Sequence, residues 1–347
     1  MVTFVARAEP APASAWVNIS DPVLEKLTAE GKKPAWPFAS AGVHVDRASG
    51  DVFMVISGQG LFRSSDKGKT FARCDGGAVG GRCETGYAIA VDYARPGRFV
   101  CAMLDGKCAL TLDNGKTWRP LKDVGRNWDY VAVDWTAEEP QTLFGMHHES
   151  GGQLMHSTDG GKSWAKSEKH KEFSAVGVAG ADTLMTVKLD GIQRSTDGGK
   201  TWAEASKFTP LGRLAVTGPD GALYWMARDP LLPGAVPDPK NPPGTFLIVS
   251  KDKGATWAKQ GEKTPAPSPW GPYFGKDEKH VVTLTKKGVI IESRDAGQTW
   301  TDVIQLPAKG YETSNPGWFV NVAYDPTGDV FYASRMGQPC LKYERGK

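Results

Sequence analysis

The chain has 347 residues, of which 40% are hydrophobic and 23% are charged, so it can bury an ordinary globular core. Its 42 Lys and Arg nearly balance its 39 Asp and Glu, and a net charge of +3 gives no indication of a nucleic-acid-binding protein. No apolar run approaches the roughly 18 residues that a membrane-spanning helix needs. With 41 Gly and 24 Pro the chain is rich in turns, and few stretches show helical periodicity.

The first residues, MVTFVARAEPAPASAW, include a run rich in alanine and proline but no complete signal peptide. We expect residues 1–14 to form a flexible segment and residues 15–347 to form a single domain. The run is compatible with the end of an export signal or with an artificial start. It favours a secreted or periplasmic protein.

Four of the five cysteines lie close together, in CDGGAVGGRC and CAMLDGKC. This spacing favours disulfides between Cys74 and Cys83 and between Cys101 and Cys108, with Cys340 free. Such bonds would also indicate an oxidising compartment. A zinc site is the alternative, although neither pair has the CxxC spacing that zinc sites prefer.

One octet recurs along the chain: STDGGKSW from Ser157 returns as STDGGKTW from Ser195. A relaxed pattern, Ser/Thr-x-Asp-x-Gly-x-Ser/Thr-Trp/Phe, occurs six times at intervals of 38 to 55 residues. Intervals of this size are typical of a four-stranded propeller blade. The aspartates of the six octets are Asp66, Asp113, Asp159, Asp197, Asp252 and Asp295.

Three short apolar stretches separated by turns precede each octet. Before the second octet they read YAIAVD, RFVCAML and CALTL, which is typical of short β-strands. The octet would then form the turn from the third to the fourth strand. Its carboxylate can accept backbone N–H groups, its glycine permits a positive φ, and its aromatic ring can pack between blades. Six copies at blade spacing favour this structural role over six active sites.

The octets resemble the Asp-box, or BNR, repeat of sialidases, two-domain xyloglucanases, sortilin-type receptors and photosystem assembly factors. The resemblance covers nearly the whole chain and implies an all-β protein built as a β-propeller of four-stranded antiparallel blades. It does not extend to the sialidase site, because KPAWPFASAGVHVD before the first octet lacks the Arg-Ile-Pro motif of that family.

Six octets suggest six blades, but a further set of strands follows the last octet. GWFVNVAYD, DVFYASR and PCLKYE predict three strands without an octet. AWVNIS, residues 15–20, resembles the segment that follows each octet, so it can supply the fourth strand of that blade. We therefore predict seven blades, with the last blade closed by the N-terminal strand, and keep six blades as the alternative.

A propeller usually binds its ligand around the central axis, on the face opposite the octets. On that face GRNWDY, residues 125–130, combines several polar side chains just before an inner strand. Asp129 and Glu84 could form the pair of carboxylates that glycoside cleavage requires, one as general acid and the other as base or nucleophile. The alternative is that both simply cap turns.

Two adjacent histidines, His147 and His148, lie in a hairpin on the same face. Neighbouring residues of a strand point to opposite sides, so at most one of them should face the channel as a general acid or base. Zinc held by one of them together with His156 and a carboxylate is a less favoured alternative. We expect neither a bound metal nor a cofactor.

Arginines and aromatic residues complete the predicted site. Arg126, Arg213 and Arg335 could together hold the carboxylate of a uronic or sialic acid. Tryptophans of the same face could stack on sugar rings, or they could pack between blades. These tryptophans are Trp36, Trp128, Trp270 and Trp318.

We therefore expect an exported, monomeric propeller that acts on a poly- or oligosaccharide by hydrolysis or by elimination. The alternative is a non-catalytic propeller whose same face binds a glycan or a protein, as an assembly factor does.

Overall fold

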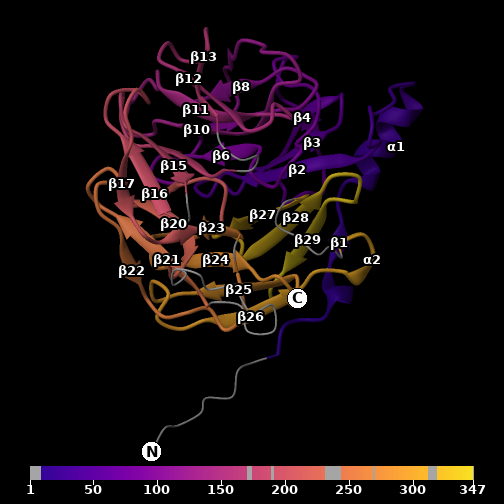
Figure 1. Ribbon diagram of the computed structural model, residues 1–347. Helices are drawn as coiled ribbons and strands as arrows, with labels where there is room; N and C mark the ends of the chain where they lie inside the picture. The colour runs from indigo at the N-terminus through magenta and orange to yellow at the C-terminus, as the bar shows by residue number, and fades with distance from the viewer. Residues whose placement is uncertain are drawn as a thin grey trace, which may run out of the picture.

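Seven antiparallel sheets follow one another around a ring (Figure 1). The computed structural model describes residues 9–169, 174–188, 191–230, 244–268, 270–311 and 319–346. Within these ranges the first strands of the blades line a central channel. The protein is thus a seven-bladed β-propeller with four-stranded antiparallel blades, as predicted, and the six-bladed alternative is wrong.

In blades 1 to 3 the strands run outward in the order of the sequence. They are β2 (Ser40–Val45), β3 (Val52–Ile56), β4 (Gly60–Ser64) and β5 (Ala72–Arg73); β6 (Ile89–Val91), β7 (Phe99–Cys101), β8 (Ala109–Thr111) and β9 (Arg119–Pro120); and β10 (Trp128–Val133), β11 (Leu143–His147), β12 (Gln153–Ser157) and β13 (Ala165–Lys169).

Blades 4 to 6 repeat this arrangement, except that two short strands of blade 5, β18 and β19, both pair with β20. Their strands are β14 (Val176–Val178), β15 (Leu184–Lys188), β16 (Gly191–Ser195) and β17 (Ala203–Ser206); β18 (Thr209–Pro210), β19 (Val216–Thr217), β20 (Leu223–Arg228), β21 (Thr245–Ser250) and β22 (Ala258–Gln260); and β23 (Trp270–Phe274), β24 (Val281–Leu284), β25 (Val289–Ser293) and β26 (Thr301–Gln305).

The N-terminal strand closes the ring, as the sequence predicted. Blade 7 contains β27 (Val320–Asp325), β28 (Val330–Arg335) and β29 (Leu341–Glu344), and its outer strand is β1 (Val17–Asn18). In the register of β1 and β29, Val17 lies opposite Lys342 and Asn18 opposite Leu341. This pairing covers an edge that would otherwise be open.

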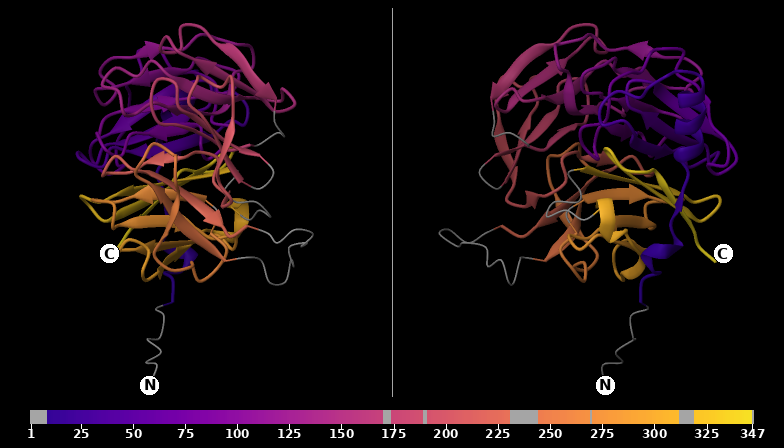
Figure 2. Two further views of the ribbon diagram at one scale, coloured as in Figure 1. Left: turned by 60° about the vertical axis from the view of Figure 1, so that its left-hand side comes forward. Right: turned by 90° about the vertical axis from the view of Figure 1, so that its right-hand side faces the viewer.

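Short helical segments accompany the sheets. They are η1 (Ala13–Ala15), α1 (Asp21–Ala29) and the irregular turn α2 (Ala308–Tyr311). In Figures 1 and 2, α1 lies at the outer rim of the ring, beside blade 1. Residues 9–14 belong to the segment that we expected to be flexible, but Ala11 forms a parallel bridge with Ile304 of blade 6. None of the described helices is long and apolar enough to cross a membrane.

Packing between blades explains why the middle strands are apolar on both sides. All five residues of β3, VFMVI, are buried, because each face of a blade is covered by a neighbour. Aromatic rings join adjacent blades: Phe53 of blade 1 lies 5.0 Å from Phe99 of blade 2, measured between ring centroids. The core is therefore a series of layers between sheets.

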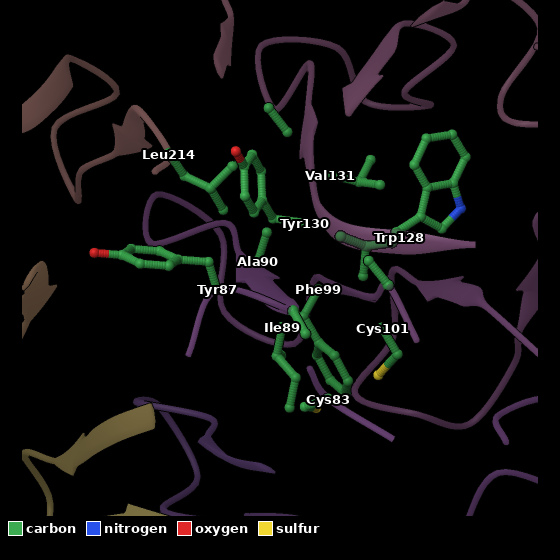
Figure 3. Close-up of a cluster of buried hydrophobic side chains, with 14 of the residues drawn as sticks. Cys83, Tyr87, Ile89, Ala90, Phe99, Cys101, Trp128, Tyr130, Val131 and Leu214 are labelled. Atoms are coloured by element: carbon green, nitrogen blue, oxygen red, sulfur yellow. The ribbon is translucent and has the colours of Figure 1, made fainter. Parts of the chain in front are cut away.

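The predicted disulfides are wrong, because all five cysteines are free thiols. Cys83 Sγ contacts Met103 Sδ at 3.9 Å, and Cys108 Sγ lies 3.2 Å from the Met103 backbone nitrogen. Cys101 is fully buried on the central strand β7, and Figure 3 shows Cys83 and Cys101 among aromatic and aliphatic side chains. Burial raises the pKa of the Cys108 thiol to about 12. These cysteines act as small apolar core residues, and they give no argument for an oxidising compartment.

Candidate functional site

The strand order divides the propeller into two faces. Each first strand starts on the face that carries the inter-blade loops and the hairpins between second and third strands, which we call the front face. The octets connect third to fourth strands and therefore lie on the opposite face. Candidate residues for binding were predicted on the front face.

The octet aspartates are engaged inside their own turns. In blade 4 the Ser195 hydroxyl donates to Asp197 Oδ1 at 2.7 Å and accepts from the Gly199 N–H at 2.8 Å. The Thr201 hydroxyl donates to Asp197 Oδ2 at 2.6 Å. This bond, followed by that of the Thr201 N–H, holds the pKa of Asp197 well below its usual range. Equivalent bonds from the last hydroxyl residue of each octet reach Asp66, Asp113, Asp159, Asp252 and Asp295.

A histidine–aspartate pair lies at the front of blade 3. His148 Nδ1 is 2.7 Å from Asp129 Oδ1, and their side chains are only 9% and 5% exposed. Asp129 is the second residue of the inner strand β10, and His148 follows the second strand β11, so one blade supplies both groups. His148 Nε2 lies 3.6 Å from Glu149 Oε1. Of the two adjacent histidines, His148 is the one that joins a predicted catalytic carboxylate.

The neighbouring predicted residues have different partners. His147 Nε2 bonds to the Gly125 carbonyl at 2.8 Å, so its ring fixes the loop before β10. Glu84 Oε2 accepts a hydrogen bond from Arg82 Nε at 3.2 Å. The structure thus places Asp129 with His148 and Glu84 with Arg82.

Charged side chains form a chain across blades 2 and 3. Arg82 donates to Asp105 at 2.9 Å, and Arg126 approaches the other oxygen of Asp105 at 3.3 Å. Arg126 also bonds Glu149 at 2.7 Å. Burial alone would raise the pKa of Asp105, but the hydrogen bonds from Arg82 and Arg126 outweigh it and lower that pKa. We call Arg82, Glu84, Asp105, Arg126 and Glu149 the front cluster.

The backbone of the front cluster adopts unusual conformations. Three residues of the cluster and the adjacent Asn127 have a positive φ: Asp105 at 51°, Arg126 at 45°, Asn127 at 54° and Glu149 at 45°. Such conformations cost roughly 1–3 kcal/mol each and tend to occur at functional sites. Asn127 is buried and links the loops, because its carbonyl accepts from the His148 N–H at 3.0 Å and its amide donates to the Gly106 carbonyl at 2.5 Å.

The predicted tryptophans fall into distinct environments. Trp36 is 54% exposed on the front face, and the Arg82 guanidinium lies 4.8 Å from its ring centroid. Trp128 is fully buried with its ring 4.2 Å from that of Trp164, a position that differs from the exposed platform that we expected. Figure 3 shows Trp128 within the core. Trp270 is only 5% exposed, and Trp318 lies outside the described residues.

The three predicted arginines occupy separate places. Arg126 belongs to the front cluster, whereas Arg335 of blade 7 donates to the Gly310 carbonyl and lies 5.9 Å from the Phe319 ring. Arg213 lies near the central channel, where its charge partly offsets the increase in the pKa of Tyr87 that burial causes. The structure does not place these three guanidiniums around one another.

The structure has one hollow in the central channel and another beside the front cluster. The central channel holds a cavity of about 60 Å³ lined by side chains such as Tyr87, Tyr273 and Asn321, which is enough for a few water molecules at roughly 10–15 Å³ each. A groove of about 590 Å³ lies beside the cluster and includes Asp105, Gly106, Lys107 and Arg126. The groove beside the cluster therefore has room for a small ligand, whereas the channel cavity does not.

Metal-binding geometry does not occur in the described ranges. There, no group of three or more His, Cys, Asp or Glu side chains is arranged to hold a metal ion. His156, which we considered as a zinc ligand, lies on β12, and burial lowers its pKa.

The site residues predicted from the sequence did not include Arg82, Asp105, Asn127 and Glu149. The available signal was positional, because Asp105 and Glu149 occupy equivalent hairpins of adjacent blades. Both carboxylates contact Arg126. This contact depends on how far each hairpin turns inward, and no sequence pattern predicts that.

A sequence profile for the BNR/Asp-box repeat matches residues 193–204, within the fourth octet repeat. This protein is an Asp-box β-propeller. No curated protein matches the sequence.

Solved structures support the fold. The propeller is similar to a GH74 enzyme of Niastella koreensis, with a TM-score of 0.53 and 16% identity, over 87% of this chain and 52% of that one. The chain thus spans about half the length of that enzyme. It is also similar to the hydrazine synthase of Kuenenia stuttgartiensis, with a TM-score of 0.52 and 12% identity, over 88% and 96% of the two chains. YCF48 bound to D1 peptide aligns with a TM-score of 0.38 and 16% identity, over 75% and 93%.

Proposed function

We propose that this propeller binds a glycan on its front face, across blades 1 to 3, and cleaves it by acid–base chemistry. The observation that carries the proposal is the buried contact between His148 and Asp129 next to the front cluster. A carboxylate that bonds one imidazole nitrogen fixes the ring orientation and stabilises its protonated form. His148 is then the general acid or base, and Asp129 positions it.

Trp36 supplies the apolar part of the proposed glycan site. An exposed indole can stack on the C–H face of a sugar ring, and the contact with Arg82 holds it beside polar groups that can bond hydroxyls. Because the glycan polymers that such a site would recognise lie outside cells, we also propose a secreted or periplasmic location.

The charge of the site favours a neutral, hydroxyl-rich glycan over a uronic or sialic acid. Two guanidiniums, Arg82 and Arg126, lie among three carboxylates of the front cluster, and Asp129 adds a fourth. An anionic sugar would have to displace an existing ion pair and would face this excess of negative charge.

A second candidate function is protein binding at the same loop. Trp36 and Phe38 are 54% and 67% exposed, and large exposed apolar side chains on one loop are typical of interaction sites. This function needs no acid–base pair.

Turnover on a panel of neutral and anionic oligosaccharides separates the two functions. We expect product from a neutral glycan, and a loss of kcat of about 10²- to 10⁴-fold in His148→Gln and Asp129→Asn with binding retained. His147→Gln is the matched control, because its side chain bonds a loop carbonyl, and it should keep most of the turnover.

The results assign the function directly. Trp36→Ala should weaken glycan binding by about five- to tenfold, since one aromatic platform contributes about 1–1.5 kcal/mol. Binding without turnover would show that the propeller binds a glycan and does not cleave it. A panel that gives neither binding nor product rejects the glycan proposal and leaves the protein-binding function.

A further inference from the structure

A groove separates α1 from the outer strand of blade 1. It has a volume of about 470 Å³ and is lined on one side by residues of α1 and the turn after it, and on the other by residues 69–73. Figure 1 shows α1 at the rim of the ring, and the groove beside it shares no lining residue with the front cluster or its groove.

The floor of the groove is apolar. Val23 and Leu27, four positions apart on α1, are buried in one cluster with Phe62 of β4. Phe71, the aromatic residue of the first octet, packs against the same cluster and remains partly exposed. Val23, Leu27 and Phe62 are only 5–7% exposed, so Phe71 supplies most of the apolar surface that the groove offers.

The rim of the groove is basic. Four lining residues are cationic and one, Glu30, is acidic. Lys32 pairs with Glu30 at 2.7 Å, whereas Lys26 and Lys69 form no ion pair within 4 Å with any described residue. The lining residues thus carry a net charge of +3; Arg73 pairs with Asp75 outside the lining, so Lys26 and Lys69 are the cations that favour an anionic ligand.

One wall of the groove is an open sheet edge. β5 is the last strand of its sheet, with Ala72 opposite Arg63 and Arg73 opposite Phe62 of β4. Both of its residues are exposed. An edge strand presents backbone groups to which an extended peptide can add, whereas an anionic lipid would have no use for them.

We propose that this groove binds an extended acidic segment of a partner protein. The segment adds to β5 as a further strand, places apolar side chains against Phe71 at the edge of the buried Val23, Leu27 and Phe62, and directs its carboxylates to Lys26 and Lys69. This inference is independent of the proposed glycan site.

The test uses a fluorescently labelled peptide of alternating glutamate and leucine with the full protein, measured by fluorescence anisotropy at low and high salt. We expect saturable binding that weakens with salt, and a loss of affinity of at least about tenfold in Lys26→Glu/Lys69→Glu. Lys162→Glu/Lys200→Glu is the matched control, because both lysines are exposed at the octet position of Lys69 and the net charge changes equally.

Three further measurements decide the binding mode. A peptide with methylated backbone nitrogens and a peptide with lysine for glutamate should both fail to bind. Amide hydrogen exchange of residues 71–73 should slow when the acidic peptide binds. The proposal is overturned if the acidic peptide does not bind, if the control variant loses as much affinity, or if only an anionic fatty acid binds.

Discussion

His44 lies on β2, the innermost strand of blade 1, with its imidazole 4.8 Å from the Phe99 ring and 5.9 Å from the Phe53 ring. Burial among these aromatic rings lowers the pKa of His44 from 6.5 to about 4, although the charge of Asp46 acts in the opposite direction. The folded protein therefore keeps this histidine neutral under mildly acidic conditions.

This neutral histidine makes stability depend on pH. Below pH 6.5 the unfolded chain binds a proton that the folded chain does not bind until about pH 4. The free energy of unfolding should therefore be steady above pH 6.5 and fall by up to about 3 kcal/mol as pH drops to about 4. In His44→Phe this part of the decrease should vanish.

Urea unfolding of both proteins across this pH range measures the effect. Other titrating groups are common to both proteins and cancel in the difference. Equal slopes in the two proteins would show that His44 does not titrate in this way.

The sequence predicted which kinds of side chain lie in the site, but it did not predict which of them contact one another. Asp129 and the adjacent histidines were chosen for their place on the front face, and the structure selects His148 because it follows the end of β11. The burial of Trp128 was not predictable, because a tryptophan at the start of an inner strand looks the same in the sequence whether it faces Trp164 or solvent.

The octet turn is an element that the sequence predicts well, because the hydrogen bonds of its aspartate side chain lie within eight residues. A second recurring aspartate was missed: each one lies at or directly after the end of a first strand and accepts a backbone N–H two or three positions later. These are Asp46, Asp92, Asp134 and Asp325. The repeated Val-Asp or Tyr-Asp at strand ends was the available signal.

Loss of one octet carboxylate should weaken its turn. In the turn of blade 5, the Thr256 hydroxyl donates to Asp252, as the equivalent residue does in the other octets. The hydrogen bonds from Thr256 lower the pKa of Asp252 to about 2. Asp252→Asn should reduce the free energy of unfolding by about 1 kcal/mol or less, because the group is exposed and screened by solvent. The lowered pKa means that this contribution is present above pH 3.8 and disappears as pH falls toward about 2.

Thermal unfolding at neutral and acidic pH checks this prediction, with Glu25→Gln of α1 as a variant that loses the same surface charge. The two variants should differ at neutral pH and converge in acid. A constant difference at all pH values would contradict the proposed role of the carboxylate.

The whole ring depends on β1. The fold was predictable because six octets mark six blades. AWVNIS also matches the pattern of an outer strand, and the remaining place for such a strand was in the last blade, where it closes the ring. A hydrogen bond strengthens this closure, because the Ser20 hydroxyl accepts from the Cys340 N–H at 3.0 Å.

The disulfide prediction failed because the spacing of cysteines along the chain does not show whether the strands that carry them bring two thiols together.

Removal of β1 should open blade 7. A variant that begins at Ile19 loses the two-residue ladder with β29, and we expect a decrease of about 2 kcal/mol in the free energy of unfolding, with a melting temperature several degrees lower. A variant that begins at Glu9 keeps β1 and should unfold like the full chain. Because β29 then becomes an open edge, size-exclusion chromatography should also show association of the shorter variant. Identical melting of the two variants would contradict this dependence.

The pairing of β1 with β29 has a consequence for biosynthesis. β1 leaves the ribosome ahead of every blade, whereas β29 leaves it behind all of them. Blades 1 to 6 can form while translation continues, since each takes its strands from consecutive residues. The nascent chain must therefore hold β1 without its strand partner until translation has passed β29, and only then can the final blade assemble.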